Sequence, residues 1–168
     1  MREATWGMDS QISISDSLAR LKDIAPAGYA MALHVRFTTP TYLFQTYPKE
    51  WIDFYSQNGL VMRDPTVAWG FENTGMIRWA DLVAIDEAGV IKMAAERGIR
   101  HGFTYATDKN TSRSMTSFAQ GERDFTDAEI AEISGLVDRL HDMTASGVSL
   151  TPGTRELLRQ MSISFTHP

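Results

Sequence analysis

The sequence predicts an α+β fold, an α-β-α sandwich in which helices cover a central antiparallel sheet of about five strands. Two observations lead to this prediction. Short segments of alternating apolar residues are joined by turns that suit antiparallel neighbours, and segments with apolar residues at helical spacing stand at both ends and in the middle of the chain. The length of 168 residues is typical of one domain with its own hydrophobic core.

The first third of the chain predicts a helix followed by a hairpin. Residues 9–24 repeat apolar side chains at intervals of three and four, and Pro26 ends that helix. Residues 28–38 alternate apolar and polar side chains, and a Thr-Pro turn leads into a second strand at residues 42–46. We expect these two strands to pair with each other.

Helices dominate the predicted middle of the chain. Pro48 suits the first position of a helix that runs to residue 57, where an Asn-Gly pair suits a left-handed stop. Residues 64–71 predict a second short helix, and residues 73–79 turn into a short extended segment. A further helical pattern covers residues 87–97 and ends at a glycine.

The last third predicts two strands and the longest helix. Residues 102–107 and 112–118 alternate in character, and an Asp-Lys-Asn turn joins them. A capping box of sequence TDAE opens the helix over residues 125–145, whose apolar residues repeat at helical spacing. A linker at residues 147–152 and a short helix at 154–161 with a frayed tail complete the predicted order.

The composition excludes several classes of protein. The chain has no cysteine, which excludes disulfide scaffolds, thiol catalysis and cysteine-bound metals. Its net charge of -5 has the wrong sign for gripping nucleic-acid phosphates, so we expect no DNA or RNA binding by this chain. No apolar run is long enough to span a membrane, and the first ten residues have no signal-peptide core. We therefore expect a cytoplasmic protein.

The residues show no catalytic or metal-binding pattern. The four histidines are scattered, and none has a ligand-like partner three or four positions away. The chain has no phosphate-binding glycine loop, dinucleotide fingerprint or nucleophile elbow. The sequence therefore predicts no enzyme, no metal and no cofactor.

One segment is unusually rich in aromatic side chains. Residues 47–79 place these rings around Asp64: Tyr47, Trp51, Phe54, Tyr55, Trp69, Phe71 and Trp79. Rings with polar tips, facing one acidic acceptor, suit a concave pocket that orients a small ligand. An aromatic core, with Asp64 merely capping the helix that begins at Pro65, explains the same residues. Spacing alone does not separate the two interpretations.

Three motifs add a family resemblance. They are YPKEWIDFY at residues 47–55, RDPTV at residues 63–67 with Trp79 further on, and GIRHGFT at residues 98–104. In this order and spacing they resemble the ligand-binding domain of LuxR-type quorum-sensing receptors. The resemblance spans about residues 10–145, so we take residues 1–146 as an autoinducer-binding domain.

The resemblance implies an α-β-α fold that holds an N-acyl homoserine lactone between the sheet and one layer of helices. By resemblance, the Trp51 indole donates to the lactone carbonyl, the Tyr47 hydroxyl reaches the amide carbonyl and Asp64 accepts the amide N–H. Tyr55 and Trp79 are then expected to close over the acyl chain and the ring.

Further positions follow from the same resemblance. Ser117, or Thr116 beside it, falls where the family places a hydroxyl that bonds the amide carbonyl. Strand alternation allows only one of them to face the ligand, and we prefer Ser117. Pro65 and Gly102 match structural positions of the family. Apolar residues that are candidates to line the acyl end, and equally candidates for ordinary core, are Leu33, Val35, Leu43, Leu60 and Met115.

The resemblance changes towards the end of the chain. Residues 147–168 look like a linker and the opening of a helix-turn-helix domain, and they are too few for the complete domain. Either the chain is a natural truncation or it is an excised domain. The leading hypothesis is a sensor for an N-acyl homoserine lactone. The alternative is an antagonist that lacks a DNA-binding domain and either forms an inactive heterodimer with an intact receptor or binds a different small ligand. A homodimer is also a candidate.

Overall fold

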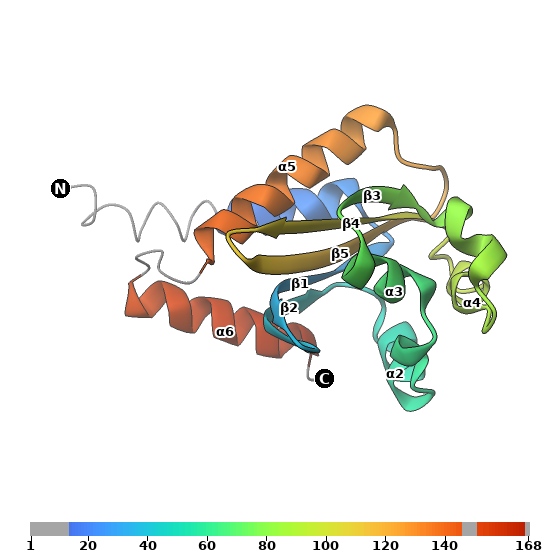
Figure 1. Ribbon diagram of the computed structural model, residues 1–168, viewed down its shortest axis with the longest axis horizontal. Coiled ribbons are helices and arrows are strands. Elements are labelled where there is room, and N and C mark those ends of the chain that lie inside the picture. The colour runs from blue at the N-terminus through green and yellow to red at the C-terminus, as the bar shows by residue number, and fades with distance from the viewer. Residues whose placement is uncertain (1–13, 146–150, 167–168) are drawn as a thin grey trace.

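The computed structural model describes residues 14–145 and 151–166, with side chains described up to residue 160. It confirms the α+β fold with a five-stranded antiparallel sheet flanked by helices (Figure 1). The strands lie side by side in the order β2-β1-β5-β4-β3. Their bounds are Gly28–Arg36 for β1, Thr39–Gln45 for β2, Gly75–Arg78 for β3, His101–Lys109 for β4 and Ser112–Gln120 for β5.

Two layers of helices lie on opposite sides of this sheet. One layer combines the first helix, described over residues 14–24, with α5 (Asp127–Met143). The other layer consists of shorter pieces: α2 (Lys49–Gln57), η1 (Leu60–Met62), α3 (Pro65–Glu72), η2 (Trp79–Ile85) and α4 (Val90–Ala95). Figure 1 shows α5 on one side of the sheet and α2, α3 and α4 towards the other side and end.

Each strand supplies both faces of the sheet because successive side chains point to opposite sides. Tyr29, Phe103 and Phe118 pack into the core beneath the first helix and α5, which we call the α5-side core. The alternate positions of the same strands, such as Ala30 and Thr104, face the short helices. We call that side of the sheet the site face.

A bulge in β1 breaks this alternation once. The register shifts between Ala32 and Val35, and His34 has a φ of 55°, in the left-handed region. Leu33 and His34 are consequently both buried on the α5 side, where the His34 ring lies 4.3 Å from the ring of His141. Leu33 therefore belongs to the α5-side core, which is the ordinary-core alternative that the sequence left open, and it does not face the site.

The hairpin between β4 and β5 is longer than the sequence predicts. Asn110 and Thr111 both have positive φ, as a two-residue type I′ hairpin turn requires, and this turn type follows the twist of the flanking strands. Pairing therefore extends to Lys109 and Ser112, right up to the turn. At the far end of this hairpin the predicted capping box is confirmed, with Thr126 and Glu129 bonding each other's backbone N–H at the start of α5.

The end of the chain differs from the prediction. Helix α6 runs over Pro152–Thr166, so it begins earlier and continues further than the expected residues 154–161 with a frayed tail. It lies against β2, and Leu158 is buried in the α5-side core. That tertiary packing, which local sequence does not reveal, stabilises the helix. The expected start of the first helix at residue 9 and most of the expected linker at 147–152 lie outside the described residues.

Two further differences concern the middle layer. The helix expected over residues 87–97 is shorter, as α4, and residues 79–85 form the 3-10 helix η2, which the sequence did not predict. Across the described residues, no helix combines the length and apolar content needed to cross a membrane.

Candidate functional site

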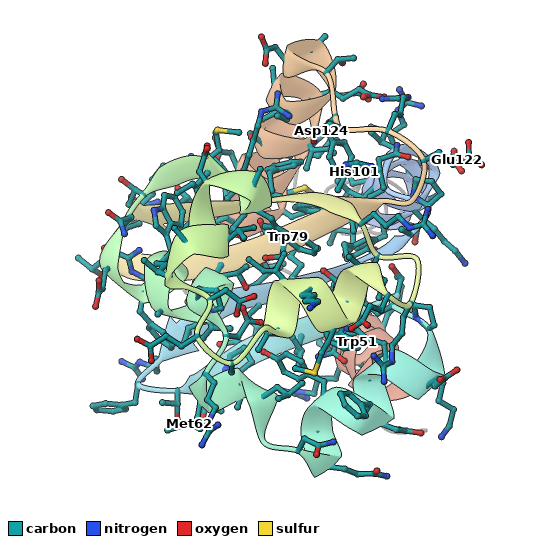
Figure 2. All side chains as sticks on the ribbon, turned by 90° about the vertical axis from the view of Figure 1, so that its right-hand side faces the viewer. Trp51, Met62, Trp79, His101, Glu122 and Asp124 are labelled. Atoms are coloured by element: carbon teal, nitrogen blue, oxygen red, sulfur yellow. The ribbon has the colours of Figure 1, made fainter. Side chains whose placement is uncertain are left out.

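Helix α2 brings three aromatic rings to the site face. Trp51 and Tyr55 are one helical turn apart, and their ring centroids lie 5.8 Å from each other. Phe54 stacks on Trp51 at 6.0 Å. Trp51 is buried, and it belongs to the same cluster of buried residues as Trp79 (Figure 2). The aromatic segment is thus an ordered cluster against the sheet.

Tyr47 enters this cluster from the loop before α2. A Cβ atom on Gly28 of β1 would lie 2.5 Å from Cδ1 of the Tyr47 ring, so only a glycine allows the ring to rest there. The Tyr47 hydroxyl donates to the main-chain oxygen of Ser117 over 3.4 Å, a long and weak hydrogen bond. Burial and the nearby Asp64 charge raise the pKa of Tyr47, so its hydroxyl remains a donor at neutral pH.

Asp64 joins α2 to α3 through its two carboxylate oxygens. Oδ1 accepts from the Thr66 backbone N–H at 2.8 Å and from the Thr66 hydroxyl at 2.7 Å, which caps α3. Oδ2 accepts from the Tyr55 hydroxyl at 2.9 Å. Pro65 occupies the first position of α3, as its ring geometry favours. Asp64 therefore caps a helix and faces the aromatic cluster at once, so the two readings of the sequence are compatible.

Burial has the largest influence on the pKa of Asp64. Burial raises the pKa of its carboxyl group, because removal from water penalises the charged form. The hydrogen bonds from Thr66 and Tyr55 act in the opposite direction. One more donor at Oδ2 would stabilise the carboxylate further. An N–H group of a ligand is such a donor.

Trp79 lies flat on β4 because of Gly102. A Cβ atom at Gly102 would lie 2.3 Å from the Trp79 ring, closer than real contacts allow. The Trp79 indole N–H donates to the Thr104 hydroxyl at 3.2 Å. Gly102 thus has a structural role, because the absence of a side chain leaves room for the Trp79 ring.

The register of β4 and β5 separates Ser117 from Thr116. Ser117 lies directly opposite Thr104, and their hydroxyl oxygens are 2.7 Å apart on the site face. Thr116 donates to the main-chain oxygen of Tyr105 and is buried. Of the two hydroxyls, only that of Ser117 bonds a side chain of the site face.

Small side chains make up much of the sheet beneath the aromatic cluster. They are Gly28, Ala30, Ala32, Gly102, Thr104, Ala106, Ser117 and Ala119. Ala30, Ala32 and Ser117 are only half-buried, although they lie in central strands. The helix layer therefore does not seal this part of the sheet. Met115 lies in the same cross-strand row as Ala32 and Ala106 and contacts α3 beside Gly70.

Arg97 closes the outer side of the cluster. Its guanidinium carbon lies 4.2 Å from the Phe54 ring centroid and 5.6 Å from that of Trp51, a cation–π arrangement. One guanidinium N–H donates to the Met93 main-chain oxygen. The buried Nε has no hydrogen-bond partner among the described residues.

Four residues of this site were not among the expected site residues: Gly28, Thr66, Arg97 and Thr104. Thr66 and Thr104 nevertheless lie within the motifs RDPTV and GIRHGFT. A signal existed for Thr104, because it stands two positions after Gly102 and strand alternation places both on one face. Contacts of Gly28 and Arg97 connect segments far apart in the chain, which local pattern does not reveal. Within the described ranges, no group of three or more His, Cys, Asp or Glu side chains is arranged to hold a metal ion.

Comparison with known proteins decides the family. The family model of the autoinducer binding domain matches residues 12–143, most of the chain. The chain belongs to the autoinducer-binding domains of LuxR-type regulators. This is a family of signal-binding regulator domains rather than of enzymes.

One curated relative of this autoinducer-binding domain is the transcriptional activator protein LuxR of Aliivibrio fischeri. The two are 31% identical over 87 residues, which are 49% of this chain and 35% of that relative. The match thus spans only about a third of the activator.

Solved structures show the same fold. The solution structure of residues 1–171 of Escherichia coli SdiA has a TM-score of 0.61 at 18% identity, with 93% of each chain covered. CepR2 from Burkholderia cenocepacia, described as an N-acylhomoserine lactone dependent LuxR family factor, has a TM-score of 0.58 at 17% identity, covering 86% of this chain and 95% of its own. SdiA in complex with octanoyl-rac-glycerol has a TM-score of 0.55 at 17% identity, covering 92% and 70%.

Proposed function

We propose that this domain binds an N-acyl homoserine lactone between the site face of the sheet and helices α2 and α3. The observation that supports this most is Asp64, a largely buried carboxylate that already receives three hydrogen bonds from Thr66 and Tyr55. A secondary amide offers the further N–H that such a carboxylate favours. A charge-assisted bond of this kind is about twice as strong as a neutral one.

The polar groups around Asp64 complement an acylated lactone. Tyr47 and Ser117 present hydroxyls near each other, since Tyr47 already reaches the Ser117 backbone, and they suit the amide carbonyl. The Trp51 indole N–H, which makes no hydrogen bond to another described residue, suits the lactone carbonyl. Tyr55 holds Asp64 in place. Complete pairing matters, because a buried polar group left unpaired costs about 1–3 kcal/mol.

The acyl chain would lie over the small side chains of the site face. Each buried methylene contributes about 0.8 kcal/mol, so preference for chain length depends on how far this apolar strip extends. Ala32, Met115 and Leu43 continue the strip across β1, β5 and β2. Two of the apolar residues expected at the acyl end, Leu43 and Met115, lie on the site face. A third, Leu60, lies in the buried cluster that contains Trp51 and Trp79.

A monoacylglycerol is a second candidate ligand, because the structurally similar SdiA was solved with octanoyl-rac-glycerol. An acylglycerol carries an ester, which has no N–H for Asp64, although its free hydroxyls are donors. The two candidates thus differ in what they offer the carboxylate.

Thermal unfolding of the purified chain tests the proposal. The chain is melted with N-acyl homoserine lactones of short, medium and long acyl length, with acylglycerols of the same lengths, and with the free fatty acids as controls. A ligand at one hundred times its Kd stabilises by about 2.7 kcal/mol, which raises the Tm by roughly 5–10 °C for a domain of this size. A rise with lactones of one acyl length supports the proposal. A rise in Tm with acylglycerols alone contradicts the proposal. The absence of a rise with every lactone contradicts it as well.

A further inference from the structure

Three side chains on the site face form a continuous chain of hydrogen bonds. The Trp79 indole Nε1 lies 3.2 Å from the Thr104 hydroxyl, and the Thr104 and Ser117 hydroxyl oxygens lie 2.7 Å apart. The three residues come from η2, β4 and β5, so the chain of bonds crosses from the helix layer to the centre of the sheet. The direction of each bond decides what the last hydroxyl offers to a ligand.

Donor and acceptor can be assigned first in the hydrogen bond between Trp79 and Thr104. An indole N–H is a donor only, so the Thr104 oxygen must be the acceptor of this bond. A hydroxyl has one proton to give and two lone pairs. Thr104 therefore still has its own proton, and that proton needs an acceptor.

Burial decides where the Thr104 proton goes. Thr104 is 2% exposed, so water does not replace a missing partner. Among the described residues, Ser117 is the only further partner of its hydroxyl. An unpaired buried donor is costly, so the Thr104 hydroxyl donates to the Ser117 oxygen.

Ser117 is the last residue in this series of hydrogen bonds, on the half-buried part of the site face. It is half-buried, and its neighbour across β1 is Ala30, which has no polar side chain. With one lone pair engaged by Thr104, the Ser117 hydroxyl is left to direct its own proton away from Thr104. The half-buried, unsealed part of the site face is where that proton meets a ligand.

We propose that Thr104 is a positioning residue that turns the Ser117 hydroxyl into an oriented donor, so that the site selects a ligand with a hydrogen-bond acceptor at this point. This inference rests on the proposed function, in which that acceptor is the amide carbonyl of the ligand. Trp79 takes part at the far end of the chain, since its N–H is committed to Thr104 and only its ring is left for contact with the ligand.

A pair of ligands that differ at the acceptor atom tests the inference. In the thioamide analogue of an N-acyl homoserine lactone, the oxygen is replaced by sulfur, which is a much poorer acceptor. Sulfur is also larger and makes the N–H a stronger donor, but these differences are the same for every variant, so the change in the ratio of the two Kd values reports the acceptor bond. Titration calorimetry on the full chain gives the ratio of the two Kd values. We expect the unaltered protein to prefer the amide roughly tenfold, the order of one well-formed hydrogen bond.

The variants are compared by the ratio of the amide and thioamide Kd values rather than by affinity alone. Thr104→Val keeps the shape and removes the hydroxyl, which leaves the Ser117 hydroxyl free among three staggered positions, so we expect the preference to fall about threefold. Thr104→Ser should restore it. Ser117→Ala should remove most of it, and adding Thr104→Val to Ser117→Ala should change the ratio no further, because the two act through one bond.

A general loss of packing lowers the affinities for the amide and for the thioamide equally, so it leaves the ratio of their Kd values unchanged. If Thr104→Val does not fold, Thr104→Ala removes the same hydroxyl with a smaller side chain, and the same threefold fall is expected. An unchanged ratio in Thr104→Val or, failing that, in Thr104→Ala would overturn this inference alone, as would equal binding of amide and thioamide by the unaltered protein. Binding of neither ligand would overturn the proposed function and this inference with it.

Discussion

The two faces of the sheet are built from the same strands and differ in almost every property. On the α5 side, the strands carry large apolar side chains, among them Tyr29, Phe44, Phe103 and Phe118, which are fully buried. On the site face, most of the alternating positions carry glycine, alanine, serine or threonine, Leu43 and Met115 are larger exceptions, and the large rings come from the helices and loops.

This difference separates stability from recognition. The α5-side core is filled by large side chains of the sheet together with those of the first helix, α5 and α6, so it packs without any other molecule. The site face leaves its volume to be filled from above, by Trp51, Tyr47 and Trp79 and, in the proposed function, by a ligand. Changes on the first face should therefore act on folding, and changes on the second mainly on binding.

The largest expected effect is on the α5 side. Phe118→Ala removes a fully buried ring from the centre of the sheet, and we expect it to lower the free energy of unfolding by about 3–5 kcal/mol. Urea unfolding followed by fluorescence measures the change. Phe37→Ala is the matched control, because that ring is 97% exposed, and it should leave stability nearly unchanged. Equal losses in both variants would contradict the assignment of the core.

Asp64→Asn should show the opposite pattern, a loss of binding with the fold retained. Asparagine still caps α3, but it removes the charge that strengthens the bond to the ligand amide, so we expect about 1.5–3 kcal/mol of lost affinity, roughly 10- to 100-fold. Asp53→Asn is the control, since that carboxylate is paired with Lys49 on the outer part of α2. Calorimetry with the lactone found by thermal shift measures both.

The pH dependence of binding sharpens the same test. Burial raises the pKa of Asp64, and a ligand N–H favours its charged form. Affinity in the unaltered protein should therefore weaken as the pH falls through that raised pKa, while Asp64→Asn should lack this dependence. Lactone affinity that is unchanged by the substitution at every pH would rule out Asp64 as the amide acceptor.

Gly102→Ala tests whether the site face tolerates a larger side chain under Trp79. The added Cβ would lie 2.3 Å from the Trp79 ring, so the ring must move. We expect a cost of about 1–3 kcal/mol in stability, as for other overpacked positions, together with weaker lactone binding. Gly135→Ala on α5 is the control, because a Cβ there meets nothing within 4 Å. A Tm for Gly102→Ala at or above that of the control would contradict the close approach.

The smallest expected effect is a pH response on the α5 side. Burial, together with the neighbouring His141, lowers the pKa of His34, so the folded domain binds fewer protons there than the unfolded chain. The stability that this provides is present above the ordinary value of 6.5 and is lost as the pH falls from there through the lowered pKa. Thermal melts from pH 7.5 to about 5 should show this fall. In His34→Gln the slope, whatever the absolute Tm, should be shallower, and an identical slope would exclude His34 as the source.

Local sequence predicted much of the architecture because local rules decide it. The capping box at Thr126, the Asp64-Pro65 start of α3 and the alternation of β4 and β5 each follow from residues next to one another. The aromatic motif was recognised for a similar reason, since Tyr47, Trp51 and Tyr55 are spaced along one short segment that forms α2 and the turn before it.

The structural features that the sequence did not predict have a common cause. The bulge at His34, the length of α6 and the Gly28–Tyr47 contact all depend on groups far away in the chain: the His34 ring bonds the end of α5, α6 rests on β2, and Tyr47 rests on β1. Contacts of this range select a conformation that local propensity leaves open.

The sequence by itself determined the fold class and the family, and it supplied most of the residues of the proposed site, because hydrophobic period, capping and motif spacing depend on neighbouring residues. Only the tertiary structure decided that Ser117 rather than Thr116 faces the site, that Leu33 belongs to the opposite core, and that Thr104 links Trp79 to Ser117. Such choices depend on strand register and on burial. A shift of one residue in register reverses the face of every side chain, and only the folded neighbours determine that register.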